Sequence, residues 1–266
     1  MDAIENRQQR FGGQLKAWRN RRRMSQLDFA LEAEISQKHL SFIETGRSAP
    51  SRDMVIRLTE CLDVPLRERN TLLLAAGYAP MYLARELDDP SLKAAREAID
   101  LLLKGHEPYP AIAVDRHWNM VASNAAITPF LAVLSEPSLL EPPVNVLRLS
   151  LHPGGLAPYI GNLGNWKSHL LDRLRHQIEV TADPALAELA KELGAYPAGS
   201  EATDDHHDYH DYGDVFVPFE LHMPSGKLAF FSTITVFGTP VDVTLSEIAI
   251  ESFFPANDET RVALGG

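Results

Sequence analysis

The first 77 residues carry hydrophobic positions at helical spacing, interrupted by short polar breaks. Leu15 and Trp18 give the first predicted helix an apolar stripe. Leu27, Ala30 and Leu31 recur at i, i+3 and i+4, which predicts that they form the inner face of a second helix. We therefore expect this part of the chain to be all-helical.

The third predicted helix is short and ends sharply. Ser36 is a good N-cap, and Gly46 is a good residue to follow the last turn. Leu40 and Ile43 lie three positions apart and predict a buried face. The opposite face is mostly polar, so it can hydrogen-bond base edges or phosphates, and Phe42 can touch a thymine methyl group. The second and third helices together have the layout of a helix-turn-helix unit.

Other boundaries follow from the same signals. Ser25 and Asp28 have the spacing of a capping box at the start of the second helix. Ser51 is expected to cap a fourth helix, and Pro65 to open a fifth that ends at Gly77. A five-helix bundle used only for dimerisation is the alternative interpretation of this region.

The pattern changes after residue 104. Ala111 to Val114 and Trp118 to Val121 predict two strands. Helical spacing returns from Trp166 to Leu174 and from Pro184 to Leu193. Three long strands follow, in DVFVPFELHM, KLAFFSTITVF and VDVTLSEIAIESFF. Antiparallel strands with helices over one face predict an α+β domain.

These patterns predict a three-part organisation. Residues 1–78 form the all-α helix-turn-helix domain. Residues 79–104 form a linker and a connecting helix that starts near Asp89 and Pro90. Residues 105–266 form the α+β domain.

The two predicted domains differ in net charge. The whole chain has a formal charge of −11, which is unfavourable for binding phosphates. Residues 1–52, however, hold ten Lys and Arg against six Asp and Glu, and the acidic excess lies in the remainder. A basic module joined to an acidic one can therefore still bind DNA.

Composition adds further limits. The single cysteine, Cys61, rules out an intrachain disulfide and fits a reducing compartment. The N-terminus has no apolar signal segment, and the longest apolar run, from Leu72 to Ala84, is too short to span a membrane. We expect a cytoplasmic protein with no membrane partner.

The helical region also resembles a known family. SQLDFA, SQKHLSFIETGR and the following PS are similar to the lambda-repressor-like XRE class of bacterial regulators, over roughly residues 11–77. The resemblance implies a double-stranded DNA operator, with Gln26 on a phosphate and Glu44 tied to neighbouring arginines. It implies DNA contacts by a group of side chains on or beside the third helix: Ser36, Gln37, Lys38, Ser41, Phe42 and Arg47. The turn departs from the family pattern, because Glu34 stands where glycine is usual, and the turn is therefore expected to be built differently.

The rest of the chain resembles a second family. PPVNVLRLSLHPGGLAP, NLGNWKSHLLDRLRHQI and FFSTITVFGTPVDVTLSEIAIESFFPA look like the ligand-binding domain of MmyB-like transcription regulators. This likeness implies a PAS-like domain with an apolar cavity, which holds a fatty acid in at least one relative. No cofactor is required. The candidate cavity residues are aromatic, and core packing is the alternative role for them: Trp118, Phe130, Trp166, Phe230 and Phe231.

One segment has metal-binding residue types. DDHHDYHDYGD contains His206, His207 and His210 among aspartates, a mixture that suits Zn²⁺, Ni²⁺ or Fe²⁺. The segment is expected to be a solvated loop without preorganised ligands, so these histidines are weak candidates. No nucleophile elbow, P-loop or dinucleotide fingerprint occurs, and we predict no catalytic residues.

The sequence thus predicts a sequence-specific, homodimeric DNA-binding regulator that senses a small apolar effector. Two alternatives stay open. One is a metal sensor or metal-dependent enzyme that uses residues 204–214. The other is a C-terminal domain that only dimerises.

Overall fold

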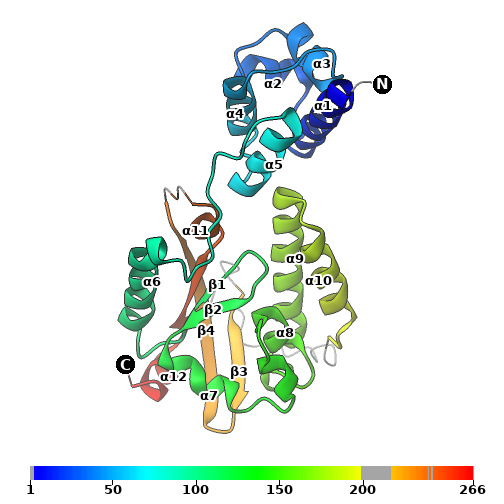
Figure 1. Ribbon diagram of the computed structural model, residues 1–266. Coiled ribbons are helices and arrows are strands. Elements are labelled where there is room, and N and C mark those ends of the chain that lie inside the picture. The colour runs from blue at the N-terminus through cyan, green and yellow to red at the C-terminus, as the bar shows by residue number, and fades with distance from the viewer. Residues whose placement is uncertain (1–2, 199–216, 239, 241, 266) are drawn as a thin grey trace. The chain divides into compact units, whose positions relative to one another are not determined.

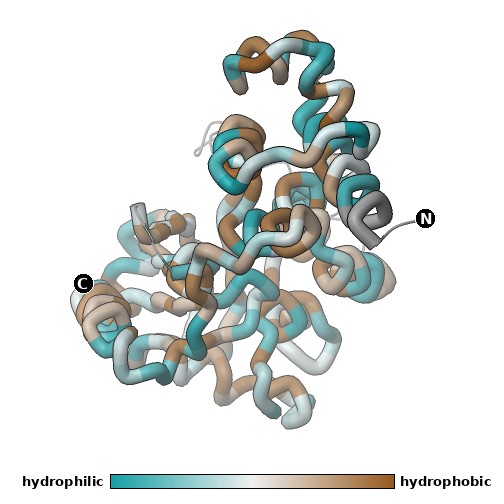
Figure 2. Tube along the Cα trace, turned by 45° about the horizontal axis from the view of Figure 1, so that its top comes forward, coloured by the Kyte–Doolittle hydropathy of each residue, from teal (hydrophilic) through white to brown (hydrophobic). Residues whose placement is uncertain are grey.

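The computed structural model describes residues 3–198, 217–238, 240 and 242–265. The chain divides into two compact units. The first comprises Met1–Arg85, Glu179–Thr181 and Pro240–Ser246, and the second comprises the remaining residues. Hydrophobic and hydrophilic residues are interleaved along the trace (Figure 2). Within the described residues, no helix is long and apolar enough to cross a membrane.

The first unit contains a bundle of five helices (Figure 1). Their apolar faces meet in one core that includes Phe11, Leu15, Leu40 and Leu58, all nearly inaccessible to solvent. The helices are α1 (Ala3–Arg21), α2 (Gln26–Glu32), α3 (Gln37–Glu44), α4 (Arg52–Cys61) and α5 (Leu66–Ala76).

Three serines start helices in this unit, as the sequence predicts. Each side chain accepts a hydrogen bond from a backbone N–H in the first turn of its helix: Ser25 for α2, Ser36 for α3 and Ser51 for α4. The capping box between Ser25 and Asp28 is present in both directions. These caps fix where α2, α3 and α4 begin.

The predicted inner face of α2 is wrong for two of its three residues. Leu27 is 52% exposed and Leu31 is 68% exposed, whereas Ala30 is buried. Phe29 and Ala33 are buried in their place. Leu27 and Leu31 are four positions apart, and so are Phe29 and Ala33, so the spacing alone does not tell which pair is buried. The face with Phe29 is the one that packs against the other helices in the core of the first unit.

The turn between α2 and α3 keeps the conformation that glycine usually supplies. Glu34 has φ 53°, in the left-handed region, and its backbone N–H donates to the carbonyl of Leu31. The expectation of a differently built turn is therefore wrong. This conformation is energetically unfavourable at Glu34, because the backbone of a residue with a Cβ is strained in the left-handed region.

Replacing Glu34 by glycine is expected to stabilise the protein by roughly 0.5–1 kcal/mol, because relief of the strain outweighs the extra entropy of the unfolded chain. Urea unfolding followed by circular dichroism measures the change. Glu34→Ala is the control, since it removes the same side chain but keeps the strain. Equal stability of the two variants would show that the backbone of Glu34 is not strained.

The second unit is built on an antiparallel sheet. Among the described residues the sheet has the strand order β2-β1-β5-β4-β3. The strands are β1 (Ala111–Val114), β2 (Met120–Ser123), β3 (Phe219–Met223), β4 (Gly226–Val236) and β5 (Ala249–Pro255). Trp118 lies in the turn between β1 and β2, with φ 67°, rather than in the second strand.

Helices cover both faces of this sheet, not one face as predicted (Figure 1). One face packs against α6 (Lys93–Gly105) through Ile99 and Leu103. The other packs against the remaining larger helices. These are α8 (Val146–Leu151), α9 (Leu163–Thr181) and α10 (Pro184–Ala195), and two short helices, α7 (Thr128–Leu131) and α12 (Asp258–Ala263), complete the unit.

The third long strand predicted near the C-terminus is shorter than expected. Its first half contains a helical turn, α11 (Val243–Ser246), and only its second half forms β5. The carboxylate of Asp242 accepts a hydrogen bond from the backbone N–H of Thr244 at 2.9 Å, as at a helix start. Asp242 is buried and pairs with Arg85 at 3.4 Å, which holds this turn within the first unit.

Candidate nucleic-acid interface and ligand cavity

The outer face of α3 carries the side chains predicted to meet DNA. Ser36, Gln37 and Lys38 are exposed, Ser41 is half-buried, and Leu40 on the opposite face is inaccessible. A helix held by a buried face, with its polar N-terminal residues free, has the form of a recognition helix.

Phe42 extends this face with an apolar surface. It is 36% exposed, with the ammonium of Lys38 5.7 Å and the guanidinium of Arg47 5.9 Å from its ring centre. The two cations flank the ring within cation–π range. This grouping can meet phosphates through the cations and a thymine methyl through the ring.

Gln26 is tied into the protein. Its amide nitrogen donates to Oε2 of Glu44 at 2.7 Å, which leaves one N–H for a phosphate. Glu44 is 6% exposed and also accepts two hydrogen bonds from the guanidinium of Arg19, at 2.6 and 3.1 Å. The network joins α1, α2 and α3, and it agrees with the structural role predicted for Glu44.

Two of the arginines at the end of α1 have structural partners. Arg19 pairs with Glu44, and Arg22 donates to the carbonyls of Leu62 and Asp63, at the C-terminus of α4. These arginines satisfy helix ends and buried charge within the bundle. Part of the positive charge of residues 1–52 is thus used inside the domain.

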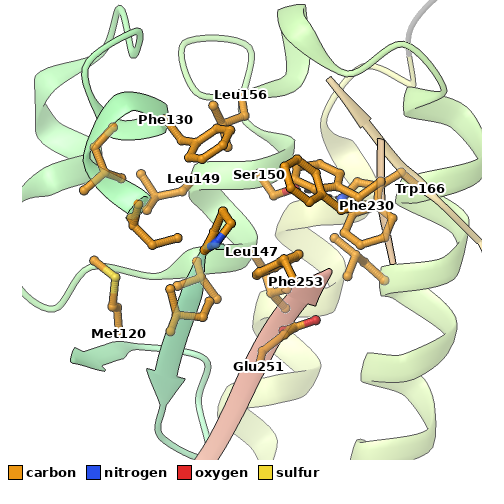
Figure 3. A pocket seen from close by; sticks show the side chains of 17 residues that line it. Met120, Phe130, Leu147, Leu149, Ser150, Leu156, Trp166, Phe230, Glu251 and Phe253 are labelled. Carbon is orange, nitrogen blue, oxygen red and sulfur yellow. Dashed lines mark hydrogen bonds between the residues drawn. The ribbon is translucent and has the colours of Figure 1, made fainter. Parts of the chain in front are cut away.

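A cavity of about 100 Å³ lies in the second unit, between the sheet and α7, α8 and α9 (Figure 3). Its wall is almost entirely apolar. Ser150 is one of its few polar residues, and its hydroxyl accepts a hydrogen bond from the indole N–H of Trp166 at 2.9 Å. An apolar wall with so few polar groups suits an apolar ligand.

Three of the five aromatic residues predicted for the cavity line it: Phe130, Trp166 and Phe230. Phe231 does not, because neighbouring residues of a strand point to opposite faces, and it stacks on Phe254 away from the cavity. Trp118 does not either. Its indole N–H donates to Gln177.

Sequence reasoning missed most of the wall. Met120, Leu147, Leu149 and Phe253 belong to it, as does Glu251. The alternation of β5 was visible in IESFF, and it places Glu251 and Phe253 on one face. The face that meets the cavity could not be read from the strand alone.

A polar group lies next to this wall on α9. Arg173 pairs with Glu251, and its guanidinium lies 4.3 Å from the ring centre of Trp118. His169 stacks on Trp166 with ring centres 5.6 Å apart. Burial, followed by the charge of Arg173, lowers the pKa of His169.

The metal candidates His206, His207 and His210 lie outside the described residues. Within the described part of the chain, no group of three or more His, Cys, Asp or Glu residues is placed to hold a metal ion.

Comparisons with known proteins give a family match in each unit. The family model for a helix-turn-helix matches residues 15–69. The model for the MmyB-like transcription regulator ligand binding domain matches residues 95–265. No curated protein matches the chain. A solved structure, the clp gene regulator ClgR from Corynebacterium glutamicum, is 19% identical, with 40% of this chain and 97% of that chain covered and a TM-score of 0.24.

A helix-turn-helix unit joined to a ligand-binding domain points to a transcription regulator. The chain belongs to the family of MmyB-like transcription regulators. Both resemblances stated from the sequence are confirmed, and so is the fold class, an all-α domain followed by an α+β domain.

Proposed function

We propose that this regulator binds a specific operator through α3 and responds to a small apolar effector in the cavity of the second unit. The observation that carries the proposal is the apolar cavity inside a domain of the ligand-binding family. An effector must bind one state of the regulator better than another to change DNA affinity. The strands β4 and β5, which line the cavity, flank the segment Pro240–Ser246 of the first unit, and this gives a covalent route between the two.

The volume of the cavity limits the size of the effector that fits without movement of the walls. At about 100 Å³ it is smaller than the roughly 150 Å³ cavity that admits benzene. The acyl chain of a fatty acid, the ligand that the family resemblance implies, fits only if the walls move apart. A molecule of five to six non-hydrogen atoms requires less movement.

Mass spectrometry of the purified protein, native and then after solvent extraction, tests the effector. A stoichiometric apolar compound that changes operator affinity supports the proposal. A protein that carries no compound and whose stability does not respond to added apolar molecules would instead favour a domain that only dimerises.

The regulator is also proposed to act as a homodimer. Two-fold symmetry would present two copies of α3 to two half-sites about one helical turn apart. Light scattering of the free protein, together with footprinting of its operator, measures the stoichiometry. A monomer on a single half-site would refute this part.

Lys38→Ala is expected to weaken operator binding about tenfold, because it removes an exposed cation from the DNA-facing side of α3. Fluorescence anisotropy at fixed salt, on an operator selected from random duplexes by the wild type, measures the loss. Lys16→Ala is the control, because it removes an equal charge from an exposed position of α1. If Gln37→Ala and Lys38→Ala both leave the affinity unchanged, α3 is not the reading helix.

A further inference from the structure

The cavity wall contains one charged residue, Glu251, among the lining residues of the described chain. Figure 3 shows Glu251 on β5, below Phe253 in that view. The residue is only 5% exposed, and its presence in an otherwise apolar wall is unfavourable unless the charge is compensated.

Hydrogen-bond donors compensate the charge of Glu251 at one of its two carboxylate oxygens. Oε1 accepts hydrogen bonds from the guanidinium of Arg173 at 3.1 Å and from the hydroxyl of Ser232 at 2.8 Å. No described residue donates a hydrogen bond to Oε2. Among the described residues, this largely buried carboxylate thus keeps one oxygen without a hydrogen-bond donor, in the wall of the proposed ligand cavity.

We propose that Glu251 selects the effector by its head group. The cavity takes a neutral apolar molecule that carries a hydrogen-bond donor, such as a hydroxyl group, and excludes the free carboxylate of a fatty acid. This inference rests on the proposed ligand-binding function, and it names the chemistry of the ligand.

The electrostatics decide between head groups. A hydroxyl donates to the free oxygen of Glu251 and adds no charge to a desolvated site. A ligand carboxylate would bring a second negative charge against it, which is costly in the low dielectric of an apolar cavity. An ammonium would have to be desolvated beside Arg173, which already neutralises Glu251.

Three small probes of similar size test the selection on the full-length protein. They are 1-pentanol, its isomer butyl methyl ether, which has no donor, and pentanoate. Binding is followed by the NMR shifts of labelled methyl groups on the cavity residues Met120, Leu147 and Leu149. We expect 1-pentanol to bind at least about tenfold more tightly than the ether or pentanoate.

Glu251→Gln separates head-group selection from general packing. The carboxamide removes the charge and offers an N–H to a carboxylate, so the preference for 1-pentanol over pentanoate should fall at least about tenfold. Glu188→Gln makes the same chemical change at an exposed position of α10 and should leave the preference unchanged.

The outcomes distinguish the two proposals. If all three probes bind the wild type equally, selection by Glu251 is overturned while the cavity remains a ligand site. If no probe shifts the methyl groups, the ligand-binding function fails as well. Should Glu251→Gln not fold, the comparison of the three probes on the wild type still decides.

Discussion

Glu44→Ala is expected to destabilise the first unit by about 3–5 kcal/mol. The substitution leaves the guanidinium of Arg19 buried and without its carboxylate, and it removes the acceptor for the amide of Gln26. Hydrogen exchange of backbone amides in α1, α2 and α3 measures the free energy of opening in this unit alone.

The control for Glu44→Ala is Glu60→Ala. Glu60 also pairs with an arginine, Arg69, but the N···O distance is 3.5 Å and the carboxylate is 55% exposed. Because water screens that pair, its loss should cost at most about 1 kcal/mol. A similar small loss for Glu44→Ala would mean that the buried network does not hold the three helices together.

This network also lies next to the proposed DNA interface. Glu44 ends α3 and holds Gln26 at the start of α2, so it links the recognition helix to the residue predicted to meet phosphate. Glu44→Gln keeps an acceptor for Gln26 but loses the charge that Arg19 requires. It should therefore destabilise the unit less than Glu44→Ala does.

Phe230→Ala is expected to destabilise the second unit by about 3–5 kcal/mol and to enlarge its cavity. Phe230 is 1% exposed and lies edge-on to Phe130 and Phe253, with ring centres 6.1 and 6.4 Å apart. Its removal deletes apolar contacts in the core and leaves a space that a small apolar molecule can refill. Hydrogen exchange of the β4 amides measures the loss.

Refilling distinguishes a cavity from general damage to the fold. Added benzene should raise the melting temperature of Phe230→Ala more than that of the wild type, because the larger space binds it better. Phe231→Ala on the same strand is the control, since Phe231 is half-buried on the other face. It should cost less and leave the response to benzene unchanged. Equal responses of both variants would show that Phe230 does not bound the cavity.

The sequence by itself determined the elements that depend on neighbouring residues. Ser36 and Gly46 fixed the ends of α3, because caps act within one turn of a helix. Leu40 and Ile43 fixed its buried face. These local signals, with the motifs that carry the family resemblance, were enough for the helix-turn-helix unit and its outer face.

The tertiary structure decided which of two equivalent faces packs inward. On α2 the periodicity fitted Leu27 and Leu31, but Phe29 and Ala33 are buried. On β4 the alternation separated neighbouring phenylalanines without showing which one meets the cavity. Local patterns show which residues share a face of a helix or strand. What that face packs against is decided by residues distant in the chain.

Glu251 is the clearest case of this limit. Its charge is typical of a solvent-facing strand residue, and it was not among the predicted cavity residues. Burial of its carboxylate requires compensation, and Arg173 supplies this from α9, 78 residues away in the chain. The sequence thus determined the class of protein and the exposed face of the helix that we propose reads DNA. Only the packing of α9 against β5 decided that a charged residue lines the cavity, because the charge that stabilises it there is not local in sequence.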